Sequence, residues 1–411
     1  MKALVSAKGG DVLAWRAGAD FAATFRQALL ARLEFCRTNE AEALLSGAGL
    51  ALDDLIAAND TFRRHCTDLL EEVPGCGEPL RLKALTTTFY AGLYGHVGVH
   101  HSAPAFYEFS TRFLVALSGS VIRTAHASLG LPERQAPQVR LIALGPAGRL
   151  EFSPFCPLQL MLVHSEAGEA ERELLSRLGR LIHEGFEACG LLVDATVTPR
   201  NPEWSGSMPE WRQRLGQRLE QGQMDDLIDL CRLADQSELY CDGGVAVEFA
   251  PLCRSLLKEC QSAMAFQVTR VCNLSHGIGM MGGLRLKKNG PYRGQFALRD
   301  NALQPLSAAV SVLALLKGLE TSSTPERIRE ILSRHELDVD TAERLLQAWH
   351  ALHELRLTRE YDLQPDWSNE APLHLNVGAL PDSDQRLLRE SLEAVGAIQR
   401  LVGQTFSSME D

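Results

Sequence analysis

Hydrophobic residues recur at helical spacing over most of the first third of the chain. Residues 21–33, 51–73 and 103–131 each keep one apolar face at a period of about 3.6 residues. The segment 130–137 (GLPERQAP) then brings a glycine and two prolines close together, which is typical of a domain boundary. The pattern therefore predicts a helical N-terminal region over residues 1–135.

Between residues 136 and 245 the apolar runs become short, as in β-strands. Four such runs are expected to form strands: 139–144, 160–163, 191–197 and 226–231. An amphipathic helix over 168–190 and another around Trp211 lie between them. This order predicts a small mixed sheet with helices packed on it.

Helical spacing returns over residues 246–411. A glycine-rich insert at 277–283 interrupts it and leads to a predicted hairpin around Asn289-Gly290. A later helix is expected to begin where Ser323 or Thr324 can cap it and Pro325 suits its first turn. The fold class predicted for the whole chain is α+β, in three parts: 1–135, 136–245 and 246–411.

Composition narrows the class of protein. The chain has 411 residues, 45% apolar and 23% charged, as in ordinary globular proteins. No apolar run approaches the roughly 20 residues that span a bilayer, and the N-terminus lacks a signal-peptide pattern, so we expect a cytoplasmic protein without membrane contact. The ten cysteines form no CxxC pair and are expected to be reduced thiols. A net charge of −11 argues against nucleic acid as a partner.

A glycine turn between the first two predicted strands is the first candidate site. Gly145 and Gly148 permit a tight turn whose backbone N–H groups can face a phosphate, and Arg149 could add a cation. The turn is neither a P-loop nor a dinucleotide-binding fingerprint, because no GK[ST] follows it and a strand succeeds it. Taken alone, such a turn is more often only a connection.

The residues around this turn resemble a known family. Ala143–Glu151 (ALGPAGRLE) is similar to the opening motif of the putative nucleotidyltransferases related to the N-terminal part of protein-PII uridylyltransferase (GlnD-type). Similar motifs follow in the same order: Gly185-Phe186 with Cys189, Asn201–Trp204, Asp229–Cys231, Leu303–Leu306, Val312–Leu315 and Thr324–Arg327. The resemblance covers about residues 105–405. It implies a nucleotidyltransferase-type sheet domain and a helical C-terminal domain that resembles a substrate-binding domain.

The resemblance also implies a chemistry. Such enzymes transfer a nucleotidyl group from an NTP with two Mg²⁺ ions, held by two aspartates at i, i+2 on one strand and a third on a neighbouring strand. Here the paired positions are Pro157 and Gln159, and the third, Asp229, is kept. Two further departures remove polar groups: Pro146 replaces the serine of the turn, and Cys231 replaces an arginine after the third acid.

The helical domain departs from the family as well, since Ser311 stands where an arginine usually precedes the Val-Leu-Ala-Leu segment. Loss of two metal-binding carboxylates would abolish transfer by this mechanism. We therefore hypothesise a catalytically degenerate protein that acts as a regulatory scaffold and binds a nucleotide or a protein partner. Gly145, Gly148, Arg149 and Lys287 are its candidate nucleotide-binding residues, and Asp229 is a catalytic remnant.

Two alternatives stay open. An active nucleotidyltransferase could use NTP and Mg²⁺ held by Glu151 and Asp229, with Gln159 as a neutral ligand. A structural module, compatible with a homo-oligomer, could fill the cleft with apolar side chains; the candidates for that role are Phe152, Phe155, Leu158 and Met161.

The remaining candidates are basic residues and histidines. Arg285, Lys287, Lys288 and Arg293 form a cationic patch on an acidic chain, which could bind phosphate or an acidic partner or be simply a basic hairpin. His96 and His100 have the i, i+4 spacing of metal ligands, but two glycines weaken that helix. We expect His350 and His353 on the polar side of an amphipathic helix.

Overall fold

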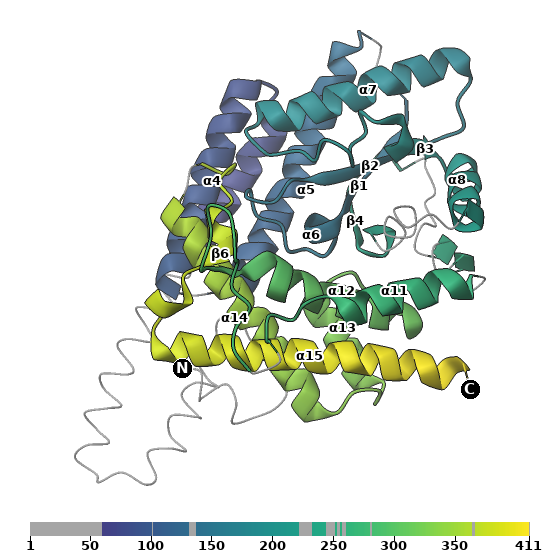
Figure 1. Cartoon of the computed structure of the whole chain (residues 1–411). Helices are drawn as coiled ribbons and strands as arrows, with labels where there is room; N and C mark the ends of the chain where they lie inside the picture. Colours follow the sequence, from purple (N-terminus) through teal and green to yellow (C-terminus); the bar gives the residue numbers. More distant parts are fainter. Residues whose placement is uncertain are drawn as a thin grey trace. The chain divides into compact units, whose positions relative to one another are not determined.

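Two compact units divide the chain, Met1–Leu69 and Leu70–Asp411. The structure, a computed structural model, describes residues 60–100, 102–130, 137–221, 232–243, 251–252, 255–256, 260–279, 282–363 and 366–410. In the first unit, residues 60–69 are helical. The predicted helix 21–33 lies outside the described residues. The sheet and all labelled helices belong to the second unit (Figure 1).

Two long helices open the second unit, α4 (Pro79–His100) and α5 (Ala103–Ser128). The second begins at Ser102, whose hydroxyl accepts a hydrogen bond from the backbone N–H of Ala105 and so caps the first turn. The helices pack through aromatic side chains, with the rings of Phe89 and Phe113 stacked at 4.2 Å. The predicted helix over 103–131 is therefore confirmed.

The sheet has four strands, β1 (Val139–Leu144), β2 (Gln159–His164), β3 (Ser205–Ser207) and β4 (Gln236–Cys241). Their spatial order is β3-β2-β1-β4. The pairs β1–β2 and β1–β4 are antiparallel, whereas β2–β3 is parallel, so the sheet is mixed as predicted.

Helices bury both faces of this sheet. Ile142 and Leu144 belong to a buried cluster with Trp204, just before α8 (Met208–Gln221), and Trp211, in the first turn of α8. On the other side α5 packs against β4 and α7 (Glu169–Ala188). Every residue of β1 except Arg140 is buried, as expected for a strand covered on both faces.

The prediction for the third strand is wrong. Of residues 191–197, only Val193 forms a bridge, parallel to Leu158. The carboxylate of Asp194 accepts hydrogen bonds from the backbone N–H groups of Thr196 and Val197, which turns the chain out of the extended conformation. The parallel neighbour of β2 is instead β3. The predicted strand 226–231 lies outside the described residues.

The C-terminal half is helical around a small insert. Its helices are α11 (Gln261–Asn273), α12 (Gln304–Leu316), α13 (Thr324–Ser333), α14 (Val339–Leu363) and α15 (Asp382–Glu410). Helix α15 packs along α11, α12 and α14, and α14 also packs against α4 and α5 (Figure 1). Together with the small mixed sheet, these helices confirm the α+β fold class.

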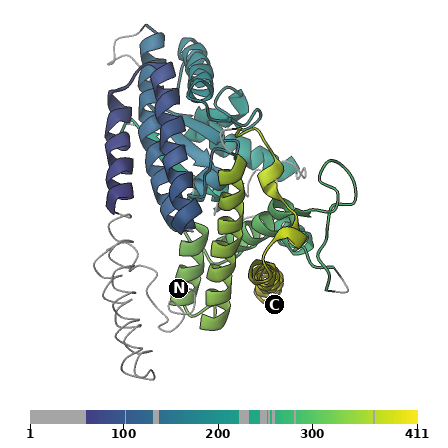
Figure 2. The same ribbon diagram turned by 90° about the vertical axis from the view of Figure 1, so that its left-hand side faces the viewer.

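The predicted hairpin around Asn289-Gly290 is present. Leu286 and Phe296 form an antiparallel bridge, and Gly290 has a φ of +84° in the turn, which suits glycine. The hairpin ends in β5 (Phe296–Ala297), which pairs with β6 (His374–Leu375). Figure 2 shows its coil projecting beyond the neighbouring helices.

The remaining elements of the described residues are short helical turns: α6 (Gly145–Gly148), η2 (Val73–Gly75), η4 (Pro202–Trp204), η5 (Arg299–Leu303), η6 (Ala371–Leu373) and η7 (Val377–Ala379). Among the helices of the described residues, none combines the length and the apolar character needed to cross a bilayer.

Candidate functional site

The candidate residues meet at one end of the sheet. Leu144, the last residue of β1, pairs with both Gln159, the first of β2, and Gln236, the first of β4. The glycine turn that follows β1 therefore lies beside the segments that precede β2 and β4. In a nucleotidyltransferase of the family described above, the acids and the phosphates would meet at this end.

The glycine turn is a single helical turn, α6, closed by its own hydrogen bonds. The amides of Arg149, Leu150 and Glu151 donate to the carbonyls of Gly145, Ala147 and Pro146, over 2.9, 3.1 and 2.7 Å. These three N–H groups are engaged by the turn itself. The predicted role of the turn in phosphate binding stays a prediction.

Glycine at position 148 has a packing reason. A Cβ atom there would lie 2.0 Å from the backbone oxygen of Asp235, a distance that real Cβ atoms do not reach. The turn thus packs directly against the backbone that leads into β4. Gly145 has a φ of +60°, and a Cβ there would lie 2.6 Å from Oε1 of Gln159.

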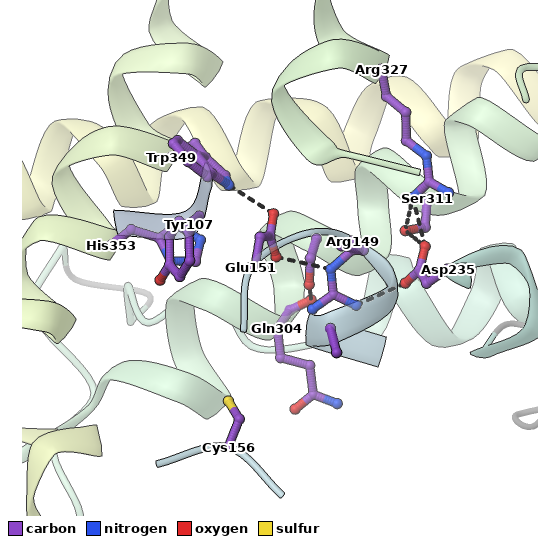
Figure 3. A network of polar contacts seen from close by, with 12 residues as sticks. Tyr107, Arg149, Glu151, Cys156, Asp235, Gln304, Ser311, Arg327, Trp349 and His353 are labelled. Atoms are coloured by element: carbon purple, nitrogen blue, oxygen red, sulfur yellow. Dashed lines mark hydrogen bonds and ion pairs between the residues drawn. The ribbon is translucent and has the colours of Figure 1, made fainter. Parts of the chain in front are cut away.

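Arg149 is held between two carboxylates. Its Nε lies 3.0 Å from Oε2 of Glu151, and its Nη1 lies 2.8 Å from Oδ2 of Asp235 (Figure 3). The Arg149 side chain is only 13% exposed. Burial alone would lower its pKa, but the two carboxylates outweigh burial and raise it. Arg149 is therefore a charged, fully paired residue of the interior.

Asp235, directly before β4, binds a second guanidinium. Nη1 of Arg327 on α13 lies 2.6 Å from its Oδ1, and the Ser311 hydroxyl on α12 donates to the same oxygen over 2.7 Å. Burial alone would raise the pKa of Asp235, but Arg327 and Arg149 hold it below its usual value. The aspartate is thus ionised and bound by groups from two parts of the chain.

Glu151 has a donor on each of its oxygens. Its Oε2 binds Arg149, and its Oε1 accepts a hydrogen bond of 2.8 Å from the indole Nε1 of Trp349 on α14 (Figure 3). The residue is 2% exposed. Burial would raise its pKa, but the Arg149 charge and the hydrogen bonds keep it low. Its predicted role as a metal ligand stays a prediction.

The two positions that lack acids face a different environment. Pro157 is exposed and Gln159 is half-buried. Nε2 of Gln159 donates to Oδ2 of Asp194 over 3.1 Å, so a carboxylate does lie beside the second acid position. That carboxylate also accepts from Thr196 and Val197, and together with Gln159 these donors lower its pKa despite the opposing effect of burial.

The remaining candidates are Asp229, Cys231 and Lys287. Asp229, with Cys231, lies outside the described residues, so its predicted role stays a prediction. Lys287 lies on the hairpin. Burial lowers the pKa of His374, and the positive charge of Lys287 lowers it further. The ion pairs of Arg149 within the described residues are those with Glu151 and Asp235. No group of three potential metal-ligating side chains occurs in the part of the chain that the structure describes.

The apolar residues proposed to fill the cleft are indeed buried: Phe152, Phe155, Leu158 and Met161. Between them, Ser153 is fixed by a second ion pair, because its hydroxyl donates to Glu360 over 3.0 Å and also contacts Arg356. Arg356 and Glu360, both on α14, are 2.6 Å apart and almost fully buried. The segment before β2 is therefore held against α14.

The prediction for the histidines of α14 is wrong for His353. It is 4% exposed, and its Nδ1 lies 2.6 Å from the hydroxyl oxygen of Tyr107 on α5 (Figure 3). Its helix packs against α13 and α15 and also against α4 and α5, so little of α14 faces solvent. Burial lowers the pKa of His353 to about 3, and that of His350 to about 4.

Sequence reasoning missed the partners of Arg149 and Glu151. From the sequence alone, Asp235 is assigned no role, and Arg327 is included only as part of a family motif. One signal was present: Ser311 replaces an arginine, and the structure shows its hydroxyl accepting a 2.7 Å hydrogen bond from Arg327. A buried carboxylate that loses one arginine needs another, so a neighbouring arginine could have been sought.

Two protein-family models match the chain, one before residue 226 and one after residue 260. Residues 93–225 match the family model "Putative nucleotidyltransferase DUF294", and residues 261–406 match "Putative nucleotidyltransferase substrate binding domain". A comparison with curated proteins found no match. The matches extend to the two domain types and not to the narrower resemblance to protein-PII uridylyltransferase.

Proposed function

Since the chain carries these two putative nucleotidyltransferase domains, we propose that it is a catalytically silent member of that type and acts as a protein-binding regulatory scaffold. The observation behind this proposal is that Arg149 and Arg327 bind Glu151 and Asp235 at the end of the sheet where metal-binding acids are expected. Divalent metals need carboxylate oxygens that are free of other cations.

The charges at this end of the sheet also favour a protein over a nucleotide as the ligand. Two guanidinium groups face two carboxylates, so Arg149 and Arg327 leave no net positive charge for a triphosphate. His353, with a pKa of about 3, adds none at neutral pH. The amides of Arg149, Leu150 and Glu151, which follow the turn, already donate to its carbonyls. A nucleotide bound here would have to break buried ion pairs, which is costly.

One observation favours the alternative of an active enzyme. Asp194 places a carboxylate beside Gln159, at the position of a missing acid, and could restore part of a metal site. Both of its oxygens already accept hydrogen bonds, however: Oδ2 from Gln159 and Oδ1 from Thr196 and Val197. This bonding is that of a structural turn, and it supports the silent scaffold more than a metal ligand.

The test combines calorimetry with a transfer assay. Each NTP is titrated into the full chain with Mg²⁺ and again with Mn²⁺, and pyrophosphate release and labelling of the chain by radioactive NTP are measured in parallel. We expect no heat of binding and no transfer. Tight, metal-dependent binding that is lost in Arg149→Ala would instead establish a nucleotide role.

A second variant separates the two functions. If the wild type transfers nucleotide and Asp194→Asn abolishes transfer while the thermal unfolding of the chain is unchanged, the active alternative is right and the scaffold proposal fails. Arg149→Lys serves as the control for Arg149→Ala, because it keeps the buried charge and removes only the forked geometry.

A further inference from the structure

The hairpin between α11 and α12 concentrates positive charge on an acidic chain. Arg285, Lys288 and Arg293 are exposed on it, and Lys287 is half-buried. Between these cations the side chain of Leu286 is 43% exposed, an unusual position for a large apolar residue. The hairpin therefore offers cations around an apolar contact point.

Helix α15 adds an exposed cation at the base of the hairpin. The exposed Arg389 donates to the backbone oxygen of Gly282, at the base of the hairpin, over 3.3 Å. Burial lowers the pKa of His276, and the charges of Arg285 and Arg400 lower it further, so both arginines act on this one side chain. Within the described residues these arginines have no carboxylate partner.

The hairpin is held in place by contacts on its inner side. The ring of Tyr292 stacks on His374 of β6 with centroids 3.9 Å apart, and β5 pairs with β6. Lys287 and the opposite strand exchange backbone hydrogen bonds, from Lys287 N to Gln295 O and from Gly294 N to Lys287 O, each 2.8 Å. A surface ordered in advance loses less entropy when it binds a partner.

We propose that this basic surface, formed by Arg285, Leu286, Lys288, Arg293 and Arg389, binds an acidic segment of another protein. The charges of the segment would face the cations, and one apolar residue of the segment would contact Leu286. Complementary charges steer such an encounter and select the partner. The inference names the partner of the scaffold proposed above and rests on that function for its biological role.

A protein segment fits this surface better than a nucleic acid does. The chain carries a net charge of −11, which repels a long polyphosphate outside the patch itself. The exposed Leu286 can make an apolar contact with a leucine of an acidic peptide, but it cannot make one with a phosphate backbone.

The experiment measures fluorescence anisotropy with the full chain and a short fluorescein-labelled peptide in which leucines are spaced among glutamates. Two further probes are the same peptide with serine for leucine and a labelled oligothymidylate. The test variant is R285E/K288E/R293E, and R285Q/K288Q/R293Q removes charge without reversing it. The matched control, R177E/R180E/R212E, changes the same charge on exposed residues of α7 and α8. Circular dichroism and thermal unfolding confirm that each variant is folded.

We expect the leucine peptide to bind the wild type and the control equally. Reversal of the hairpin charges should weaken binding about tenfold or more, added salt should weaken it further, and serine for leucine or Leu286→Ser should weaken it severalfold. The proposal would be overturned if R285E/K288E/R293E and the control R177E/R180E/R212E bound the leucine peptide equally. It would also be overturned if the wild type did not bind the peptide, or bound the oligothymidylate more tightly. The NTP assays are judged by Arg149→Ala and Asp194→Asn at the end of the sheet, and the peptide assay by the hairpin variants, so the failure of either proposal can be told from that of the other.

Discussion

Replacing Arg327 by methionine tests whether the buried ion pairs hold the helical C-terminal domain to the sheet. The Arg327 side chain is 3% exposed and donates from Nη1 to Asp235 and Ser311, over 2.6 and 2.7 Å. Its Nε and Nη2 donate to the backbone oxygens of Thr321 and Ala234, over 2.7 and 2.8 Å. Arg327→Met keeps most of the side-chain length and removes all four hydrogen bonds.

The expected loss in the free energy of unfolding follows from the buried carboxylate that Arg327→Met leaves with one partner fewer. Removing one partner of a buried ion pair destabilises a protein by about 3–5 kcal/mol, because the other charge stays buried. Arg149 still binds Asp235 in the variant, which favours the lower end of that range. With an unfolding entropy of about 2.1 cal/mol/K per residue over a unit of roughly 340 residues, this cost lowers Tm by about 4–7 °C.

Thermal and urea unfolding are followed by circular dichroism for the wild type, R327M and the control R344M. Arg344 lies exposed on α14, so its replacement should change stability by no more than about 0.5 kcal/mol. In the double variant D235N/R327M the loss should be smaller than the sum of the single losses, by about 1–3 kcal/mol, because the two side chains contact each other. If R327M unfolds at the temperature of R344M, the ion pair does not stabilise the fold and the reasoning is refuted.

Three other outcomes are expected. The pKa of His353 is about 3 in the folded protein and about 6.5 in the unfolded chain, so the unfolded state takes up this proton first as the pH falls. The free energy of unfolding should therefore decrease below about pH 6.5 by up to about 1.4 kcal/mol per pH unit, and by less in His353→Asn. A urea-unfolding profile that is flat between pH 7 and 5 would contradict this. Gly148→Ala should destabilise by about 1–3 kcal/mol or more, because its Cβ would collide with the backbone of Asp235, whereas Gly216→Ala, in an open position of α8, should stabilise by about 0.5–1 kcal/mol. Each NTP with Mg²⁺ should leave Tm unchanged, although a ligand at a hundred times its Kd would add about 2.7 kcal/mol, so a clear upward shift would count against the silent scaffold.

Local patterns were enough to predict much of the fold. The period of apolar residues predicted the strands β1 and β2 and a helix over 103–131, which the structure has at Ala103–Ser128. The Asn289-Gly290 pair predicted the hairpin. Each of these elements depends on neighbours within a few residues. The strand predicted at 191–197 failed for a local reason as well, since hydrogen bonds to Asp194 compete with the extended backbone. The prediction that His353 lies on the polar side of its helix was wrong, because the periodicity of one helix does not reveal how many other helices will cover it.

The sequence by itself determined which side chains are available: a glycine turn with Arg149 and Glu151, and Pro157 and Gln159 in place of a pair of acids. Only the tertiary structure decided what these side chains do. Arg327 and Asp235 are 92 positions apart, and Trp349 and Glu151 are 198 apart. The packing of α12, α13 and α14 on the sheet brings them together and excludes water, and in that setting a charge must find an opposite charge. Spacing along the chain carries no record of that long-range pairing.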